Sequence, residues 1–279
     1  MINQNYSTNI SKKRIFLLSV PIFFANLAIP FTGIVDTGLM GNLGEARFLA
    51  ATSIATSVMT MIIWSFGFLR MGTVGIVAQL FGKSDYREIS RTLLRNFIIA
   101  IAIGIIIILF KPIIVNFIEH FFSISNDTQE LVNTYISIRV LSVPAELIIY
   151  ILVGFYLGIQ KTNLSSLLVI TMSILNIVLS SFFVLSLNLN VFGVALGTLI
   201  SSYITAVIFS LFTYNFIVKK FQITPTFQKL IVPTKLMKLF TINFDIFIRT
   251  LLLTFSFFWI TYMGSKLGED YLAINTILM

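Results

Sequence analysis

The sequence predicts an all-α membrane protein, and three observations favour that fold class. Of the 279 residues, 57% are hydrophobic and only 11% are charged, whereas about a quarter of the residues of an ordinary soluble domain are charged. Long apolar runs, rich in the 28 Phe residues, recur over the whole chain. The basic residues lie mostly between these runs. We therefore expect a chain that folds in lipid, with helices as its spanning elements.

Six apolar runs are each long enough to cross the hydrocarbon core, which needs about 20 helical residues. They cover 15–39, 48–68 with an extension to 81, 93–110, 131–157, 164–187 and 191–218. A seventh run covers 239–263, and an eighth begins near Tyr271 but is too short to cross. We expect four parts: a cytoplasmic segment over 1–14, a six-helix lobe over 15–220, a cytoplasmic linker over 221–238, and an incomplete second lobe over 239–279.

The basic residues predict the orientation, because cytoplasmic loops carry an excess of Lys and Arg. With the N-terminus in the cytoplasm, only Arg47, Lys111 and Lys266 fall outside. The net charge of +8 then reflects topology, and we expect no nucleic-acid partner. We interpret the charged stretch 82–95 as a solvated cytoplasmic connector. The inside residues are Lys12, Lys13, Arg14, Lys83, Arg87, Arg91, Arg95, Lys161, Lys219, Lys220, Lys229, Lys235 and Lys238.

The composition excludes several kinds of chemistry. The sequence contains no Cys and a single His, His120, so it can form neither thiolate metal sites nor centres that need two imidazoles. It also lacks the metal-binding helix motif, the Ser/His pair and the nucleotide-binding Gly-rich loop of common enzymes. We therefore predict that the chain is not an enzyme and holds no cofactor.

A short motif occurs twice and predicts internal symmetry. Met-Gly-Asn-Leu-Gly-Glu at 40–45 joins the first two spans, and Met-Gly-Ser-Lys-Leu-Gly-Glu at 263–269 follows the seventh. Each copy precedes an aromatic-Leu-Ala triplet, and both point the same way across the membrane. Parallel repeats of six helices are an architecture of secondary transporters. On this interpretation most of the second lobe is missing from the chain; the alternative is a chance likeness between two Gly-rich turns.

Asp36 is the principal candidate for a functional residue. A charge at mid-bilayer costs about 2.5 kcal/mol or more, so a charge kept there is a functional candidate. Asp36 lies in the outer half of the first span, beyond Pro30, whose ring frees the carbonyl of Asn26. Gly33 and Thr37 share a helix face with Asn26 and Pro30. A carboxylate at the edge of this face can load and release a coupling ion; the alternative is an interfacial Asp that caps the helix end.

Other polar residues inside the spans are weaker candidates. Ser173, Asn176 and Ser180 share a face of the fifth span, and Thr198 and Ser202 share one of the sixth. These rows can bind a substrate or an ion, or can simply join helices by hydrogen bonds.

Arg70, Arg139 and Glu146 are the remaining embedded charges of the first six spans. Arg139 and Glu146 share a face, about 10 Å apart along a continuous helix. They can neutralise each other, or pair with Arg70 or Asp36 across a cavity.

Several segments, in the right order, resemble the DinF-type branch of the multidrug and toxic compound extrusion (MATE) transporters. The most specific is Phe-Leu-Arg-Met-Gly-Thr-Val-Gly at 68–75. The others are Val-Asp-Thr-Gly at 35–38, Arg139 with Leu-Ser-Val-Pro-Ala at 141–145, Leu-Asn-Ile-Val-Leu at 175–179, Thr198, and Ala273 with Asn275 at the end of the chain.

The resemblance implies two six-helix lobes around a V-shaped cavity in a bacterial inner membrane. It implies export of small organic compounds, often cationic or amphipathic, by alternating access, driven by entry of H⁺ or Na⁺. Asp36 then corresponds to the coupling carboxylate, and Asn176 and Thr198 line the cavity. Ser180 departs from the family, which commonly has a second Asp there. We add Asn26, Arg70, Arg139 and Glu146 as candidate cavity residues.

Two other functions are compatible with the resemblance. The chain can be a flippase for a lipid-linked substrate. It can also be an inactive fragment, or a subunit that depends on a missing C-terminal half or on a second copy of itself.

Overall fold

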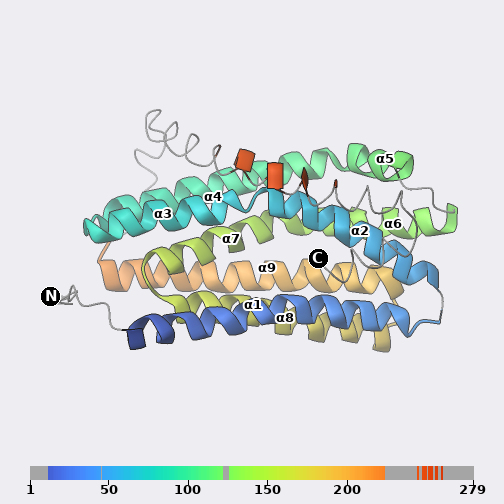
Figure 1. Cartoon of the computed structure of the whole chain (residues 1–279), viewed down its shortest axis with the longest axis horizontal. Helices are drawn as coiled ribbons and strands as arrows, with labels where there is room; N and C mark the ends of the chain where they lie inside the picture. The colour runs from blue at the N-terminus through green and yellow to red at the C-terminus, as the bar shows by residue number, and fades with distance from the viewer. Residues whose placement is uncertain are drawn as a thin grey trace.

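A computed structural model describes residues 12–44, 46–121 and 126–223, with further helical residues at 244, 247–249, 251–253, 255–256 and 259. The described part is built of helices that lie roughly along one long axis (Figure 1). The α-helices are α1 (Lys12–Gly41), α2 (Ala46–Ser65), α3 (Phe68–Gly82), α4 (Tyr86–Leu109), α5 (Lys111–Phe121), α6 (Asn126–Arg139), α7 (Val143–Gly158), α8 (Thr162–Ser181) and α9 (Asn190–Phe216). Three short elements complete them: a 3₁₀ turn, η1 (Val140–Ser142), and the π-turns η2 (Phe182–Ser186) and η3 (Ile217–Phe221).

In the part of the chain that the structure describes, six helical stretches are long and apolar enough to cross a membrane, which confirms the predicted fold class. They cover Ser19–Gly41, Arg47–Gly82, Tyr86–Leu109, Asn126–Gly158, Thr162–Ser186 and Asn190–Phe221. Isolated residues of the predicted seventh span are helical, and the eighth and residues 224–238 of the linker lie outside the described residues.

Two of the predicted spans are broken helices. The second divides at Phe66 and Gly67, where α2 ends and α3 begins. The fourth divides into α6, η1 and α7, and Pro144 lies in the first turn of α7, where its missing N–H leaves no helical bond unmade. By contrast, α1 runs through both Pro21 and Pro30 as one continuous helix.

Helix α7 forms the centre of the bundle. It packs against α3, α4, α8 and α9. In the most apolar part of its span 72% of the residues are buried, against 11% in the span of α1. Glycines allow the close contacts: a Cβ on Gly154 would lie 2.7 Å from the carbonyl oxygen of Arg70, and one on Gly104 would lie 2.6 Å from the Pro144 ring. Helix α1 packs instead on α8, at the edge of the lobe.

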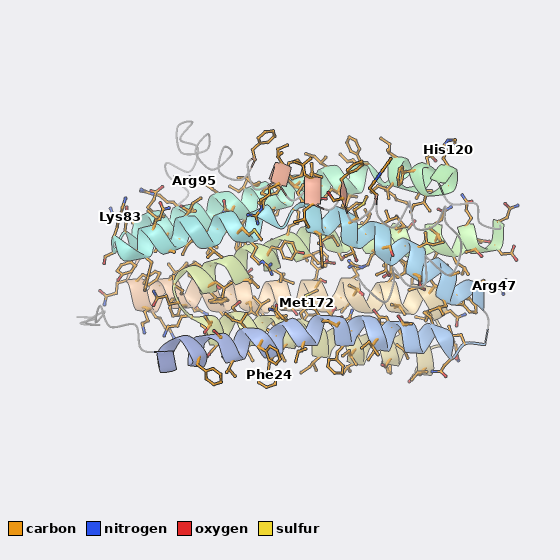
Figure 2. All side chains as sticks on the ribbon, in the orientation of Figure 1. Phe24, Arg47, Lys83, Arg95, His120 and Met172 are labelled. Carbon is orange, nitrogen blue, oxygen red and sulfur yellow. The ribbon has the colours of Figure 1, made fainter. Side chains whose placement is uncertain are left out.

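The two ends of the bundle differ in charge as the predicted topology requires. Lys83 and Arg95 lie toward the end from which α1 starts, and Arg47 and His120 lie toward the opposite end (Figure 2). The first of these ends also holds the last residues of α9 (Figure 1), which carry Lys219 and Lys220. By the excess of basic residues, this is the end that we expect to face the cytoplasm.

The interpretation of 82–95 as a solvated connector was wrong for most of the stretch. Helix α4 starts at Tyr86, and Asp85 caps it by accepting a 3.1 Å hydrogen bond from the Glu88 N–H. Glu88 and Arg95, two turns apart on one face, form a 2.7 Å ion pair, and the Arg95 side chain is only 3% exposed. The charges that predicted a surface loop are thus partly neutralised inside the lobe.

Candidate functional site

Asp36 lies where α1 packs against α8, in the outer half of the lobe. Its carboxylate interacts with the Ser180 hydroxyl on α8 and with the charge of Arg139. Both Asp36 Oδ1 and Ser180 Oγ are buried and have no well-formed hydrogen bond to any described residue. Buried oxygens normally have a donor or a bound partner. This pair is therefore suited to accept a proton or a cation.

Asn176 and Thr198 extend this group of oxygens onto α9. Asn176 Nδ2 donates a 2.9 Å hydrogen bond to Thr198 Oγ1, which donates to the Val194 carbonyl at 3.1 Å. The other amide atom, Asn176 Oδ1, is buried and accepts no hydrogen bond from the described residues. We call Asp36, Asn176, Ser180 and Thr198 the Asp36 cluster. It joins three helices and presents three buried oxygens without donors.

Gly197 is the residue that lets α9 approach α8 at this cluster. A Cβ at Gly197 would lie 2.5 Å from Ser180 Oγ and 2.7 Å from the Ser180 backbone nitrogen, which is closer than real Cβ contacts. Any larger residue would therefore push the two helices apart at the cluster.

Arg139 and Glu146 pair with each other rather than with Arg70. Arg139 Nη1 donates to both Glu146 Oε1 and Ser142 Oγ, and its Nη2 lies 3.5 Å from Glu146 Oε2. Ser142 Oγ lies 2.7 Å from Glu146 Oε1 and 2.6 Å from the Arg139 carbonyl oxygen, either of which can accept its one proton. The η1 turn and the long Arg side chain close the separation that a continuous helix would leave. The positive charge facing Asp36 is thus already paired.

Tyr135 and Thr56 belong to the same polar region, and sequence reasoning missed both. The Tyr135 hydroxyl lies 2.9 Å from Thr56 Oγ1 on α2 and also interacts with Arg139. Tyr135 precedes Arg139 by one helical turn, and this spacing is the sequence feature that could have indicated that Tyr135 lies beside Arg139.

Two sequence candidates do not join this region. Asn26 is exposed on α1, ten residues and about 15 Å of helix before Asp36. Arg70 lies on α3 with its guanidinium 5.9 Å from the centre of the Tyr150 ring, and it forms no ion pair with the described residues. The structure therefore gives neither of them a contact with Asp36. Within the described ranges, no three His, Cys, Asp or Glu side chains lie close enough to hold a metal ion.

A family model, MatE, matches residues 21–182, which is more than half of the chain. The chain belongs to the MatE family. The proteins of this family are membrane transporters, so the predictions of a multi-pass protein of the bacterial cell membrane and of a non-enzyme are confirmed.

Curated relatives agree with the MatE assignment. DNA damage-inducible protein F of Escherichia coli (strain K12) is 33% identical over 269 residues, which cover 96% of this chain and 58% of that protein. Multidrug export protein MepA of Staphylococcus saprophyticus is 26% identical over 239 residues, which cover 84% of this chain and 52% of that protein. This MatE chain therefore spans a little over half the length of these relatives.

A solved structure shows the same fold. The outward-facing structure of a multidrug resistance MATE family transporter of the MOP superfamily matches with a TM-score of 0.81 at 20% identity. The match covers 93% of this MatE chain and 57% of that one. The described helices thus follow the fold of one part of such a transporter.

Proposed function

We propose that this chain supplies the N-terminal lobe of a cation-coupled secondary antiporter. The transporter would export organic, often cationic or amphipathic, compounds by alternating access, with H⁺ or Na⁺ as the coupling ion. The observation that carries the proposal is the Asp36 cluster. It combines one embedded carboxylate with buried amide and hydroxyl oxygens that lack donors, and such intramembrane polar groups mark ion pathways.

Each member of the cluster has a distinct part in the proposed cycle. Asp36 takes up the ion, and the loss of its negative charge weakens its attraction for an organic cation. Ser180 Oγ and Asn176 Oδ1 supply further oxygens, and the bond from Asn176 to Thr198 fixes which amide atom faces inward. Glu146 holds Arg139, so that Asp36 remains available to the ion.

A second lobe is needed to complete the proposed transporter. Asn26, Pro30, Gly33 and Thr37 form an exposed face of α1, and Gly33, like Gly75 on α3, has no atom within 4 Å of an added Cβ. We propose that this open face contacts a second lobe, supplied by a C-terminal half or by a second copy of the chain. Without that partner the chain would be inactive.

A cell-based accumulation assay with a fluorescent cationic dye tests the proposal. The chain, its Asp36→Asn variant and an empty vector are compared at equal membrane expression. Asp127→Asn is the matched control, because Asp127 is a carboxylate at the outer surface, 75% exposed and 3.4 Å from Arg47.

If a second copy supplies the other lobe, we expect the chain and Asp127→Asn to lower dye accumulation equally, and Asp36→Asn to resemble the empty vector. Lowered accumulation in Asp36→Asn would remove Asp36 from the mechanism. No difference between the chain and the vector would support the inactive-fragment alternative.

A further inference from the structure

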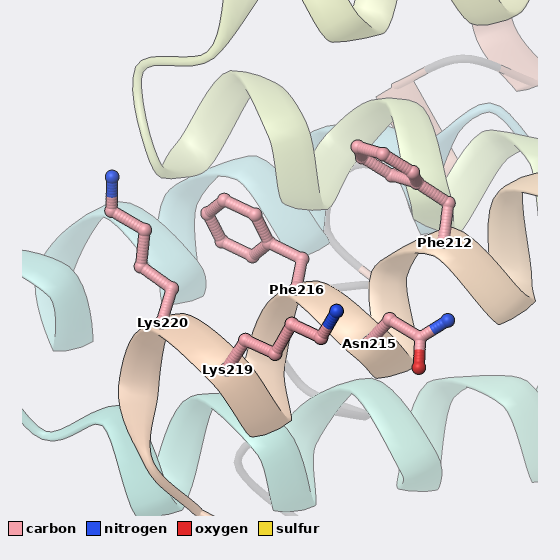
Figure 3. Close-up of a pocket in the computed structure, with 5 residues that line it drawn as sticks. All are labelled: Phe212, Asn215, Phe216, Lys219 and Lys220. Carbon is pink, nitrogen blue, oxygen red and sulfur yellow. The ribbon is translucent and has the colours of Figure 1, made fainter.

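A groove lies at the cytoplasmic end of α9, away from the Asp36 cluster. It has a volume of about 490 Å³ and is lined by Phe212, Asn215, Phe216, Lys219 and Lys220. These five side chains follow the last two turns of α9 and η3, and the Lys219 side chain extends toward Asn215 (Figure 3).

The end of α9 is held in place by aromatic contacts. Phe221 stacks on Tyr86 of α4 with ring centres 4.4 Å apart, and Phe216 packs edge-on against Phe221 at 5.5 Å. Gln222 then adopts a positive φ of 54° and ends the helical turn. The two lysines are therefore attached to a fixed backbone rather than to a loose tail.

The groove carries an uncompensated positive charge. Its lining has two Lys and no Asp or Glu, and neither Lys forms an ion pair with a described residue. The Asn215 amide adds neutral hydrogen-bond donors beside them. Two ammonium groups and an amide are complementary to a phosphodiester anion.

An apolar surface leads from the groove toward the middle of the membrane. Ile204, Ile208 and Phe212 follow one another at i, i+4 spacing on α9, and their side chains are 37%, 51% and 46% exposed. The same spacing continues through Phe216 to Lys220. Each step of four residues also turns by about 40° around the helix axis, so this row winds around α9 from exposed hydrocarbon to the positive charge at its end. These are the depths at which the acyl chains and the headgroup of one lipid lie.

We propose that this groove binds an anionic phospholipid of the cytoplasmic leaflet. Its phosphate lies at the Lys219 ammonium beside the Asn215 amide, while Lys220, on the other side of Phe216, adds positive charge (Figure 3), and an acyl chain follows Phe212, Ile208 and Ile204. Basic residues at the cytoplasmic surface attract anionic lipids, and here the groove gives that attraction a defined place. This inference does not depend on the proposed transport activity.

Lipid binding to the purified full chain in detergent tests the inference. Native mass spectrometry measures the affinity for phosphatidylglycerol and for phosphatidylcholine with the same acyl chains, and inorganic phosphate serves as a probe of headgroup-only binding. The test variant is Lys219→Gln/Lys220→Gln. The control is Lys83→Gln/Lys161→Gln, which removes the same charge from exposed positions at the same end of the bundle.

We expect the chain and the control to bind phosphatidylglycerol about tenfold more tightly than phosphatidylcholine, and the test variant to lose this preference. Equal affinity of the unmodified chain for the two lipids would overturn the inference. Equal loss in the control would also overturn it, because general surface charge would then explain the effect. Should the double variant fail to fold, Lys219→Gln and Lys220→Gln are measured separately. An unchanged preference for phosphatidylglycerol in both single variants would also overturn the inference.

Discussion

Ser180 sets the charge of the Asp36 cluster. Its hydroxyl faces the Asp36 carboxylate and is fully buried, at a position where the MATE pattern commonly has a second Asp. A hydroxyl adds an oxygen ligand without adding charge. The proposed coupling ion therefore meets a single negative charge, and Asp36 alone can balance it.

Ser180→Asp should strengthen cation binding at the cluster. A second carboxylate about 4 Å from Asp36 would raise their repulsion by about 4 kcal/mol at an effective dielectric of about 20, and a bound cation would relieve it. We expect Na⁺ to raise the thermal unfolding midpoint more in this variant than in the unmodified chain. Ser180→Asn is the neutral control, and an equal Na⁺ effect in both variants would contradict the prediction.

Glu146→Gln should destabilise the lobe. It leaves the buried Arg139 charge without its partner, and breaking a buried ion pair costs about 3–5 kcal/mol. Heat denaturation in detergent should show a lower unfolding midpoint for Glu146→Gln. The double variant Arg139→Gln/Glu146→Gln should regain part of the lost midpoint, because it also removes the unpaired charge of Arg139. A midpoint unchanged by Glu146→Gln would show that the pair does not stabilise the fold.

The residues of the cluster were predictable from the sequence, but several of their partners were not. Asp36, Asn176, Ser180 and Thr198 are conspicuous because polar groups are rare in apolar spans. Tyr135 and Thr56 are compatible with ordinary membrane helices, and only the packing of α6 beside α2 brings their hydroxyls together. Asn26 has the same conspicuous polarity as Asn176, but α1 leaves it exposed.

At the scale of helices, ten of the glycines that the structure describes fall into two groups. Gly104, Gly154, Gly158, Gly193 and Gly197 are each in tight contact with a neighbouring side chain or backbone, whereas Gly33, Gly38, Gly41, Gly75 and Gly82 have open space around them. The first group fixes the packing within the lobe. The second group, on α1 and α3, leaves open space at the surface of the lobe, where another helix can pack.

Gly154→Ala should destabilise the lobe, and Gly33→Ala should not. The new Cβ at Gly154 would lie 2.7 Å from the Arg70 carbonyl oxygen and 2.8 Å from Thr73 Cβ, and overpacking of this kind costs about 1–3 kcal/mol. At Gly33 nothing lies within 4 Å. The unfolding midpoints of the two variants provide the comparison, and equal midpoints would show that α3 moves freely away from α7.

The spans could be predicted from hydropathy, because their length is set by the membrane rather than by tertiary contacts. The breaks within them could not. Residues 66–67 and 140–142 interrupt helices without changing the apolar pattern, so a window of about 20 residues runs across them. Helix α5 was also missed, because a run of 11 residues is too short for such a window.

At the scale of the whole molecule, the open space beside Gly33 on α1 and beside Gly75 on α3 predicts a partner. The chain has no Cys, so single cysteines can report on contacts without background. If a second copy supplies the other lobe, Gly33→Cys and Gly75→Cys should each give cross-linked dimers with a bismaleimide in native membranes. Ile105→Cys on α4, 50% exposed, is the control for random collision. Dimers no more abundant than in this control would exclude a second copy at the open face.

Cation-driven flux in proteoliposomes tests the central claim most directly. The chain, Asp36→Asn and Asp127→Asn are reconstituted at equal density, and uptake of a labelled organic cation is followed after a pH or Na⁺ gradient is imposed. The account predicts uptake that depends on one of the two gradients, is retained in Asp127→Asn and is abolished in Asp36→Asn. Gradient-driven uptake that persists in Asp36→Asn, or uptake that no gradient alters, would contradict it.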